Sequence, residues 1–149
     1  MTELVKRVTI EDIAAVLKDK GFRAEKIEWV GGREALRSAS GGVGFNVVFG
    51  NGADGAYHDF TYFASFRLEG LPVEEICGNW NRARRFARLH SRDGLLNIEM
   101  DVTLGTGVDK DYVTVTLELW NQLLNELLGL LREEAVKTAG ASEPSSTMN

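Results

Sequence analysis

The chain has 149 residues, of which 44% are hydrophobic and 26% are charged, and its formal net charge is -5 at pH 7. These values are typical of one globular domain and exclude a fibrous or wholly disordered chain. The acidic balance disfavours a general binder of nucleic acid or of anionic membranes, because such proteins usually carry an excess of basic residues. The one cysteine, Cys77, excludes an internal disulfide, and together with His58 and His90 it provides too few ligands for a structural zinc site.

The first residues lack the apolar core of a signal peptide. No segment approaches the roughly 18 uninterrupted apolar residues of a membrane-spanning helix. With a single cysteine, the chain also needs no oxidising compartment. We therefore expect a cytoplasmic protein that does not enter a membrane.

The first predicted element in chain order is a helix over about 10–20. Thr9 is a suitable N-cap, the first turn is acidic, and apolar residues follow at helical spacing up to Leu17, before Gly21 ends the helix. Alternating apolar and polar residues then predict strands. Three strands are predicted: the first covers 24–30, before a turn at Gly31 and Gly32; the second consists of 35–39 and 44–50, interrupted by a Ser-Gly-Gly break; and the third covers 57–70.

A second helix is predicted over about 73–82, because Pro72 suits a helix start and one apolar stripe follows it. Two strands, over 84–92 and 95–105, come after this helix. They are joined by an Asp-Gly pair at 93–94, which is the strongest short hairpin signal in the chain.

The last predicted helix covers about 110–137. The residues after it, 138–149, are small, polar and proline-containing, and we expect them to form a disordered tail. The complete order is helix, three strands, helix, two strands, helix, with short connections. This order predicts an α+β fold with an antiparallel sheet of about five strands, built as a single domain over 1–137.

Five arginines lie between positions 82 and 92 of a chain that is otherwise acidic. The two-residue turn of the predicted hairpin sets a register in which Arg88 lies opposite Glu99 and Phe86 lies opposite Asp101. Cross-strand pairs of opposite charge stabilise a sheet by roughly 0.2–1 kcal/mol each, so we interpret the cluster mainly as part of the fold. The alternative is contact with an anionic partner through Arg82, Arg84, Arg88 and Arg92.

The remaining motifs carry no recognisable chemistry. Residues 50–55 match the dinucleotide-binding fingerprint of glycines, but that fingerprint must open a helix, and a strand follows here. Neither His58 nor His90 has a serine or cysteine at a catalytic spacing, and Cys77 lies on the apolar stripe of a helix, where a thiol stays protonated. We therefore assign no catalytic, cofactor-binding or metal-binding residue.

The last predicted helix carries two adjacent apolar rows. The first row can dock on the sheet, and it consists of Val113, Leu117, Trp120, Leu124, Leu127 and Leu131. The second row widens the apolar arc to about 200°, beyond the roughly 100° that packing on one side needs. We predict that it is an interface with another chain, formed by Tyr112, Val115, Leu119, Leu123 and Leu130. Coverage by other helices of the same domain is the alternative.

The segments NWNRARRFARLHSRDGLLNIEMDVTL and GVDKDYVTVTLELW, which together run from Asn79 to Trp120, resemble the YbjN family of bacterial sensory-transduction regulators. The resemblance covers most of the chain. The motif positions that match are Asn79, Trp80, Asn81, Arg85, Phe86, Glu99 and Asp101. The glycine-rich region over 39–55 departs from the family pattern.

The resemblance implies the fold of type III secretion chaperones, whose element order coincides with the order predicted above. It also implies a small cytoplasmic domain, commonly a homodimer, that binds protein rather than catalysing a reaction. Our first hypothesis is therefore a noncatalytic, secretion-chaperone-like domain that binds another protein. The second is a regulator that binds nucleic acid through the arginine cluster from Arg82 to Arg92. The third, an enzyme, would need a pocket that joins His58 or His90 to carboxylates.

Overall fold

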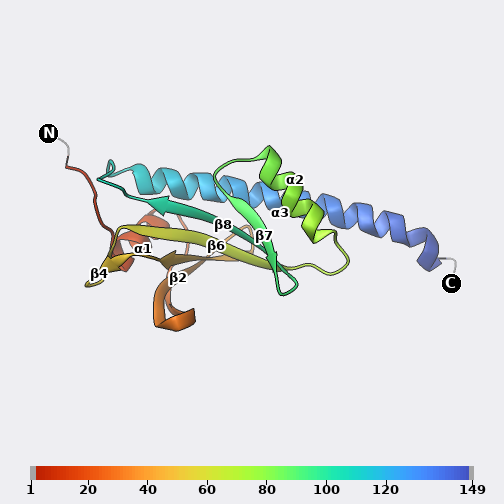
Figure 1. Ribbon diagram of the computed structural model, residues 1–149, viewed down its shortest axis with the longest axis horizontal. Coiled ribbons are helices and arrows are strands. Elements are labelled where there is room, and N and C mark those ends of the chain that lie inside the picture. The colour runs from red at the N-terminus through yellow and green to blue at the C-terminus, as the bar shows by residue number, and fades with distance from the viewer. Residues whose placement is uncertain (1–2, 148–149) are drawn as a thin grey trace.

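A computed structural model describes the backbone of residues 3–147 and the side chains of residues 3–139. It contains three helices, a short 3-10 turn and eight strands. In chain order these are α1 (Ile10–Asp19), β1 (Glu25–Trp29), η1 (Val30–Gly32), β2 (Arg33–Ser40), β3 (Val43–Phe49), β4 (Gly52–Ala53), β5 (Ala56–Tyr57), β6 (Asp59–Arg67), α2 (Val73–Ala83), β7 (Arg88–Arg92), β8 (Leu95–Thr103) and α3 (Tyr112–Thr147) (Figure 1).

The main sheet is antiparallel and has six strands in the order β1-β2-β3-β6-β8-β7. The predicted α+β class is therefore confirmed, with one strand more than the predicted five. The segments on either side of the Ser-Gly-Gly break are two separate strands, because Gly41 and Gly42 adopt φ values of 57° and 81° that reverse the chain tightly. The short β4 and β5 form a second, two-stranded sheet.

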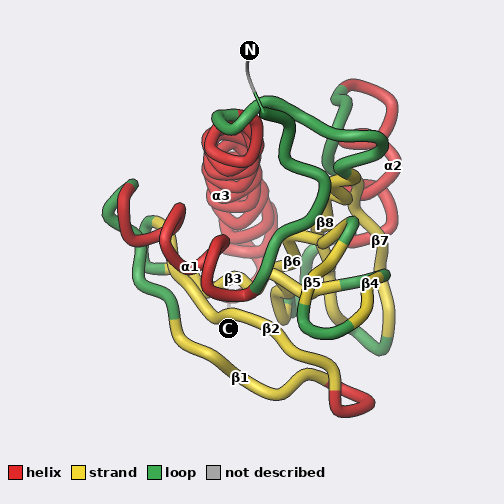
Figure 2. The backbone as a smooth tube through the Cα atoms, turned by 90° about the vertical axis from the view of Figure 1, so that its left-hand side faces the viewer, coloured by secondary structure: helices red, strands yellow, loops and turns green. Residues whose placement is uncertain are grey.

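The sheet is covered on one face by α3 and α1, while α2 lies at the β7 side (Figure 2). Alternation along β6 explains this layering. Phe60, Tyr62 and Ala64 are buried under the helices, while the side chains between them are more exposed on the other face. The centre of the core is Trp120 of α3, which stacks on Tyr62 with ring centroids 5.5 Å apart and an interplanar angle of 13°.

The helix α3 runs along the sheet and continues past it toward the C-terminus (Figure 1). It extends to Thr147, beyond the predicted helix end at 137. The predicted disordered tail over 138–149 lies mostly outside the residues whose side chains are described, and it stays a prediction. Within the described residues, no helix combines the length and apolarity that crossing a membrane requires.

Three hydrogen bonds fasten α2 to β7 and to the loop before it. The indole Nε1 of Trp80 donates to the carbonyl oxygen of Ala87 over 3.0 Å. Asn81 donates from Nδ2 to the carbonyl oxygen of Leu89 over 2.9 Å, and its Oδ1 accepts from the Leu89 N–H over 2.9 Å. The side-chain amide of Asn81 therefore occupies the outer edge of β7 as a neighbouring strand would.

The predicted strand over 84–92 is wrong in its first half. The strand β7 begins at Arg88, and its pairing with β8 ends at Arg88 and Glu99. Phe86 has a φ of 76°, in the left-handed region that an extended strand cannot contain, so the predicted pair of Phe86 with Asp101 does not form. The predicted register from Arg88 to Arg92 is confirmed.

We expect Asn81→Ala to lower the free energy of unfolding by about 2 kcal/mol, because it removes both hydrogen bonds to Leu89 and leaves that backbone unpaired. Asn79→Ala is the matched control, since Asn79 is exposed and bonds only the side chain of Arg82 among the contacts described. The control variant should lower the free energy of unfolding by about 0.5 kcal/mol or less. Urea unfolding followed by circular dichroism measures both, and equal losses would contradict the role of Asn81.

Candidate functional site

Two of the five clustered arginines are held by carboxylates. Arg84 lies 4.3 Å from the centre of the Trp80 ring and donates to Glu126 of α3 over 3.2 Å. Arg88 donates to Oε1 of Glu99 from Nε over 3.0 Å and from Nη2 over 2.5 Å. The hydrogen bonds with Glu99 raise the pKa of Arg88 above its ordinary value. The predicted cross-strand charge pair is confirmed.

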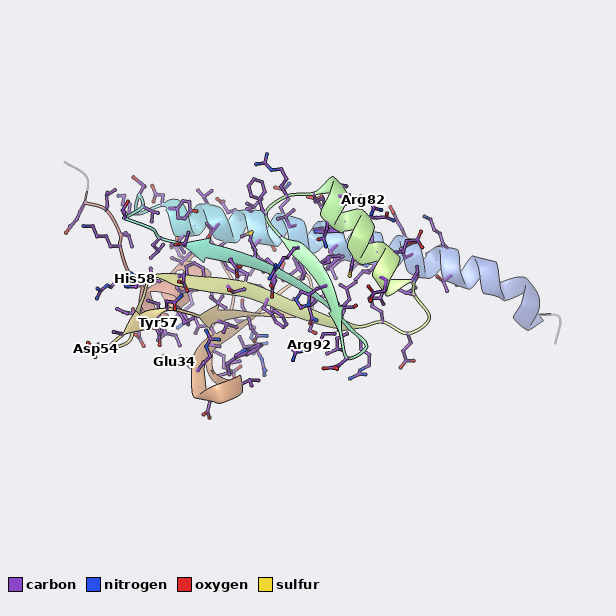
Figure 3. The ribbon with its side chains drawn as sticks, viewed as in Figure 1. Glu34, Asp54, Tyr57, His58, Arg82 and Arg92 are labelled. Carbon is purple, nitrogen blue, oxygen red and sulfur yellow. The ribbon has the colours of Figure 1, made fainter. Side chains whose placement is uncertain are left out.

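The other three arginines lie apart from each other. Arg82 bonds the side chain of Asn79 on α2, and Arg85 lies over the ring of Phe86 at 5.1 Å. Arg92 lies near the β7–β8 turn, where its Nε is 3.8 Å from Asp93 (Figure 3). The cluster is therefore divided among a helix, a loop and a strand.

Cys77, His58 and His90 lie apart from one another, but His90 shares a cavity of about 590 Å³ with Asp93 and Glu99. Cys77 is buried on α2, and burial, followed by the charge of Glu74, raises the pKa of its thiol. His58 is exposed, and His90 has its Nε2 3.5 Å from Glu99. Among residues with described side chains, no three or more of His, Cys, Asp and Glu are grouped so that they could hold a metal ion.

The two apolar rows of α3 differ in burial. The first row is buried against the sheet throughout, in Val113, Leu117, Trp120, Leu124, Leu127 and Leu131. In the second row, Leu123 is also buried, with an exposed fraction of 6%, and Leu119 and Leu130 are partly buried. Tyr112 and Val115 are exposed, at 38% and 55%. The surface that a partner could cover is therefore concentrated in the N-terminal half of α3.

The helix α2 explains this difference along the second row. Near its middle, α3 meets α2: Glu126 bonds Arg84 at the end of α2, and Leu130 lines a small cavity with Ile76 and Asn79 of α2. Toward the N-terminus of α3 the second row continues without α2 (Figure 1). We call its more accessible part the α3 strip, which consists of the exposed Tyr112 and Val115 and the half-buried Leu119.

One feature near the α3 strip does not follow from the sequence patterns. The strand β8 is paired with β6 along its whole length but with β7 only up to Glu99. The edge of β8 at Asp101 and Thr103 is therefore free of β7. The predicted strand over 84–92 would have covered this edge. The Arg-Arg-Phe-Ala segment is a signal against this prediction, because two polar residues followed by two apolar residues do not alternate as a half-buried strand does.

The comparison with protein families gives one match. The model described as "YbjN: Putative bacterial sensory transduction regulator" matches residues 9–133. The chain belongs to the YbjN family. Neither the curated proteins nor the solved structures that we compared contain a match.

In this YbjN protein, several residues of the matching motif have structural contacts. Trp80 and Asn81 fasten α2 to β7, and Glu99 holds Arg88 on the exposed face of the sheet. Asp101 accepts a hydrogen bond from the hydroxyl of Thr61 over 2.6 Å. These contacts account for much of the motif through the fold, and leave Phe86, with an exposed fraction of 64%, without a packing role in the core.

We expect Leu123→Ala to lower the free energy of unfolding by about 2–5 kcal/mol, because it opens a cavity in the core of the single chain. Val115→Ala, eight residues earlier on the same helix, should change it by about 0.5 kcal/mol or less. Chemical unfolding of the two variants at one protein concentration measures both changes. A large loss in Val115→Ala would show that Val115 is already covered in solution.

Proposed function

We propose that this YbjN protein is a noncatalytic, protein-binding domain that acts in bacterial sensory transduction or regulation. It would hold another polypeptide on its surface in the manner of a secretion chaperone. The observation that carries the proposal is the α3 strip, where Tyr112 and Val115 are exposed beside a fully packed core. The family description supports a regulatory role.

The α3 strip has the physical properties of a protein contact. Six large hydrophobic residues are exposed in the described part of the chain, and three of them, Tyr112, Val115 and Val136, lie on α3. Fully burying an exposed side chain of this size contributes roughly 1.5–3 kcal/mol to the stability of a complex, and covering the exposed fractions of these side chains contributes part of that. Leu119, which is half-buried on α3, lies seven residues after Tyr112 and four after Val115 and joins these two into one surface.

Nucleic-acid binding has less support. Arg84 and Arg88 are already paired with Glu126 and Glu99, and a phosphate would have to displace these carboxylates. The net charge of -5 provides no wider attraction for a phosphate backbone. The arrangement therefore favours a protein over a nucleic acid as the partner.

We expect Val115→Glu to abolish capture of a specific partner from a bacterial lysate, because it places a charge in the centre of the apolar contact. Val30→Glu is the matched control, since Val30 is exposed to 82% in the turn between β1 and β2, on a different side of the molecule. Affinity capture with quantitative mass spectrometry compares the two variants with the unchanged chain. A partner that both variants retain equally would contradict the proposal.

A homodimer is a further prediction from the sequence. Light scattering on the purified protein should then give twice the chain mass of 16.5 kDa. The fraction of dimer should rise with protein concentration, as mass action requires. A constant mass of one chain up to the highest soluble concentration would exclude the dimer but would leave binding to a different protein open.

A further inference from the structure

The outer edge of β8 is occupied over only half of its length. From Leu95 to Glu99 the neighbour is β7, whose own outer edge at Leu89 is closed by Asn81. Opposite the part of β8 beyond Glu99, the segment that precedes β7 is not in the sheet. It turns away at Phe86, which has a φ of 76°, and the Ala87 N–H donates to the Arg85 carbonyl oxygen over 3.0 Å. Among residues 3–147, no strand lies beside the remaining part of β8 on this edge.

The backbone groups that this edge presents follow from the pairing with β6. The N–H of Leu104 donates to the carbonyl oxygen of His58, so the even-numbered residues of β8 direct their backbone groups toward β6. The odd-numbered Asp101 and Thr103 direct theirs to the opposite side. No backbone hydrogen bond from these two residues on that side is found within the described part of the chain. Both residues are exposed.

The α3 strip runs beside this edge. Tyr112, Leu119 and Glu126 are spaced by seven residues, which is close to two helical turns, so they lie on one side of α3. Glu126 bonds Arg84 at the end of α2, so this side of the helix is turned toward α2 and β7. On the side of the α2–β7 loop that is nearer to the N-terminal end of α3, the helix α3 and the strand β8 run next to each other (Figure 1).

We propose that the free edge of β8 and the α3 strip together bind an extended segment of a partner protein as an added β-strand. The backbone of the segment would pair with Asp101 and Thr103. Its alternate side chains would point to the helix side of the sheet and cover Tyr112, Val115 and Leu119. This inference rests on the proposed protein-binding function and specifies the chemistry of the partner.

The charges beside the edge specify the other face of the segment. The carboxylate of Asp101 is exposed and accepts from Thr61, while the neighbouring Arg88 is held by Glu99. A side chain directly opposite Asp101 on the added strand lies on this same face, where a lysine or arginine forms a favourable cross-strand pair. The partner segment is therefore apolar at every second position and basic at the positions between them. A basic segment also suits the YbjN protein, because the net charge of this protein is -5.

Amide hydrogen exchange by NMR, with a short acetylated and amidated peptide of alternating valine and lysine as the probe, tests this proposal. In the free protein the amides of Asp101 and Thr103 should exchange rapidly, while those of Met100 and Val102, bonded to β6, are protected. Addition of the peptide should slow exchange at Asp101 and Thr103 by roughly tenfold or more. Unchanged exchange at both amides at saturating peptide would overturn the proposal.

Three controls identify the contacts. The same peptide with N-methyl groups on the amides that face β8 should not bind, while methylation of the amides that face away should be tolerated. Val115→Glu should abolish binding, and Asp101→Asn should weaken it by at most about fivefold, as expected of one exposed cross-strand ion pair. A peptide with the same residues in two blocks should fail to bind. Equal binding of all peptides would overturn strand addition.

Failure of this inference can be separated from failure of the proposed function. One outcome is that the capture of a partner depends on Val115 while the amides of Asp101 and Thr103 in the complex still exchange as in the free protein. That result overturns strand addition and leaves the proposed protein binding intact. A dimer of this chain that Val115→Glu dissociates would show that a second copy covers the α3 strip, and would likewise overturn the proposed partner segment. Loss of both the capture and the peptide binding would remove both proposals.

Discussion

The packing of α3 on one face of the sheet is the interaction on which the rest of the structure depends. Trp120 is fully buried, stacks on Tyr62 and meets Phe45 edge to face at 5.8 Å. The hydroxyl of Tyr62 is paired with Thr116 at 2.9 Å, and burial raises the pKa of that hydroxyl well above its ordinary value. Of the helices in the described part of the chain, α1 and α2 are too short to cover the face from β2 to β8, so they pack at the margins of α3.

The position of α2 follows from this central packing and decides which part of α3 is free. The helix is fastened to β7 and its approach by Trp80 and Asn81, and it touches α3 through the pair of Arg84 and Glu126. It therefore covers the second apolar row only from the middle of α3 onward. Two residues of the arginine cluster take part in these contacts, because Arg84 joins the end of α2 to α3 and Arg88 joins β7 to β8.

The sequence predicts this fold well where one local pattern determines one element. The Asp93-Gly94 turn sets the register of β7 and β8, and the predicted contact of Arg88 with Glu99 is present. The prediction fails at 84–87, where it continues the register of the hairpin although Trp80 takes the carbonyl of Ala87 as its acceptor. That contact joins residues on two elements, and no periodicity within either segment reveals it.

The second apolar row shows the same limit for the candidate site. Helical spacing places Tyr112, Leu123 and Leu130 in one row, yet Leu123 is buried while Tyr112 is exposed. Their difference depends on where α2 lies, which is a tertiary property. The sequence therefore predicts that α3 has more apolar surface than a sheet alone can cover, but not which residues remain for a partner.

The outer edges of β7 and β8 connect the fold to the proposed function, because one is closed and the other is partly open. A free edge of unpaired backbone groups invites association, and proteins usually close or shorten such edges. Here Asn81 closes β7 with a side-chain amide, so edge protection is built into the same motif that fastens α2. A few residues away, the left-handed turn at Phe86 leaves Asp101 and Thr103 open beside an apolar helix surface. The closed part of the sheet edge ends where the α3 strip begins. This arrangement favours a binding site at the open part of β8 over an edge that is merely left uncovered.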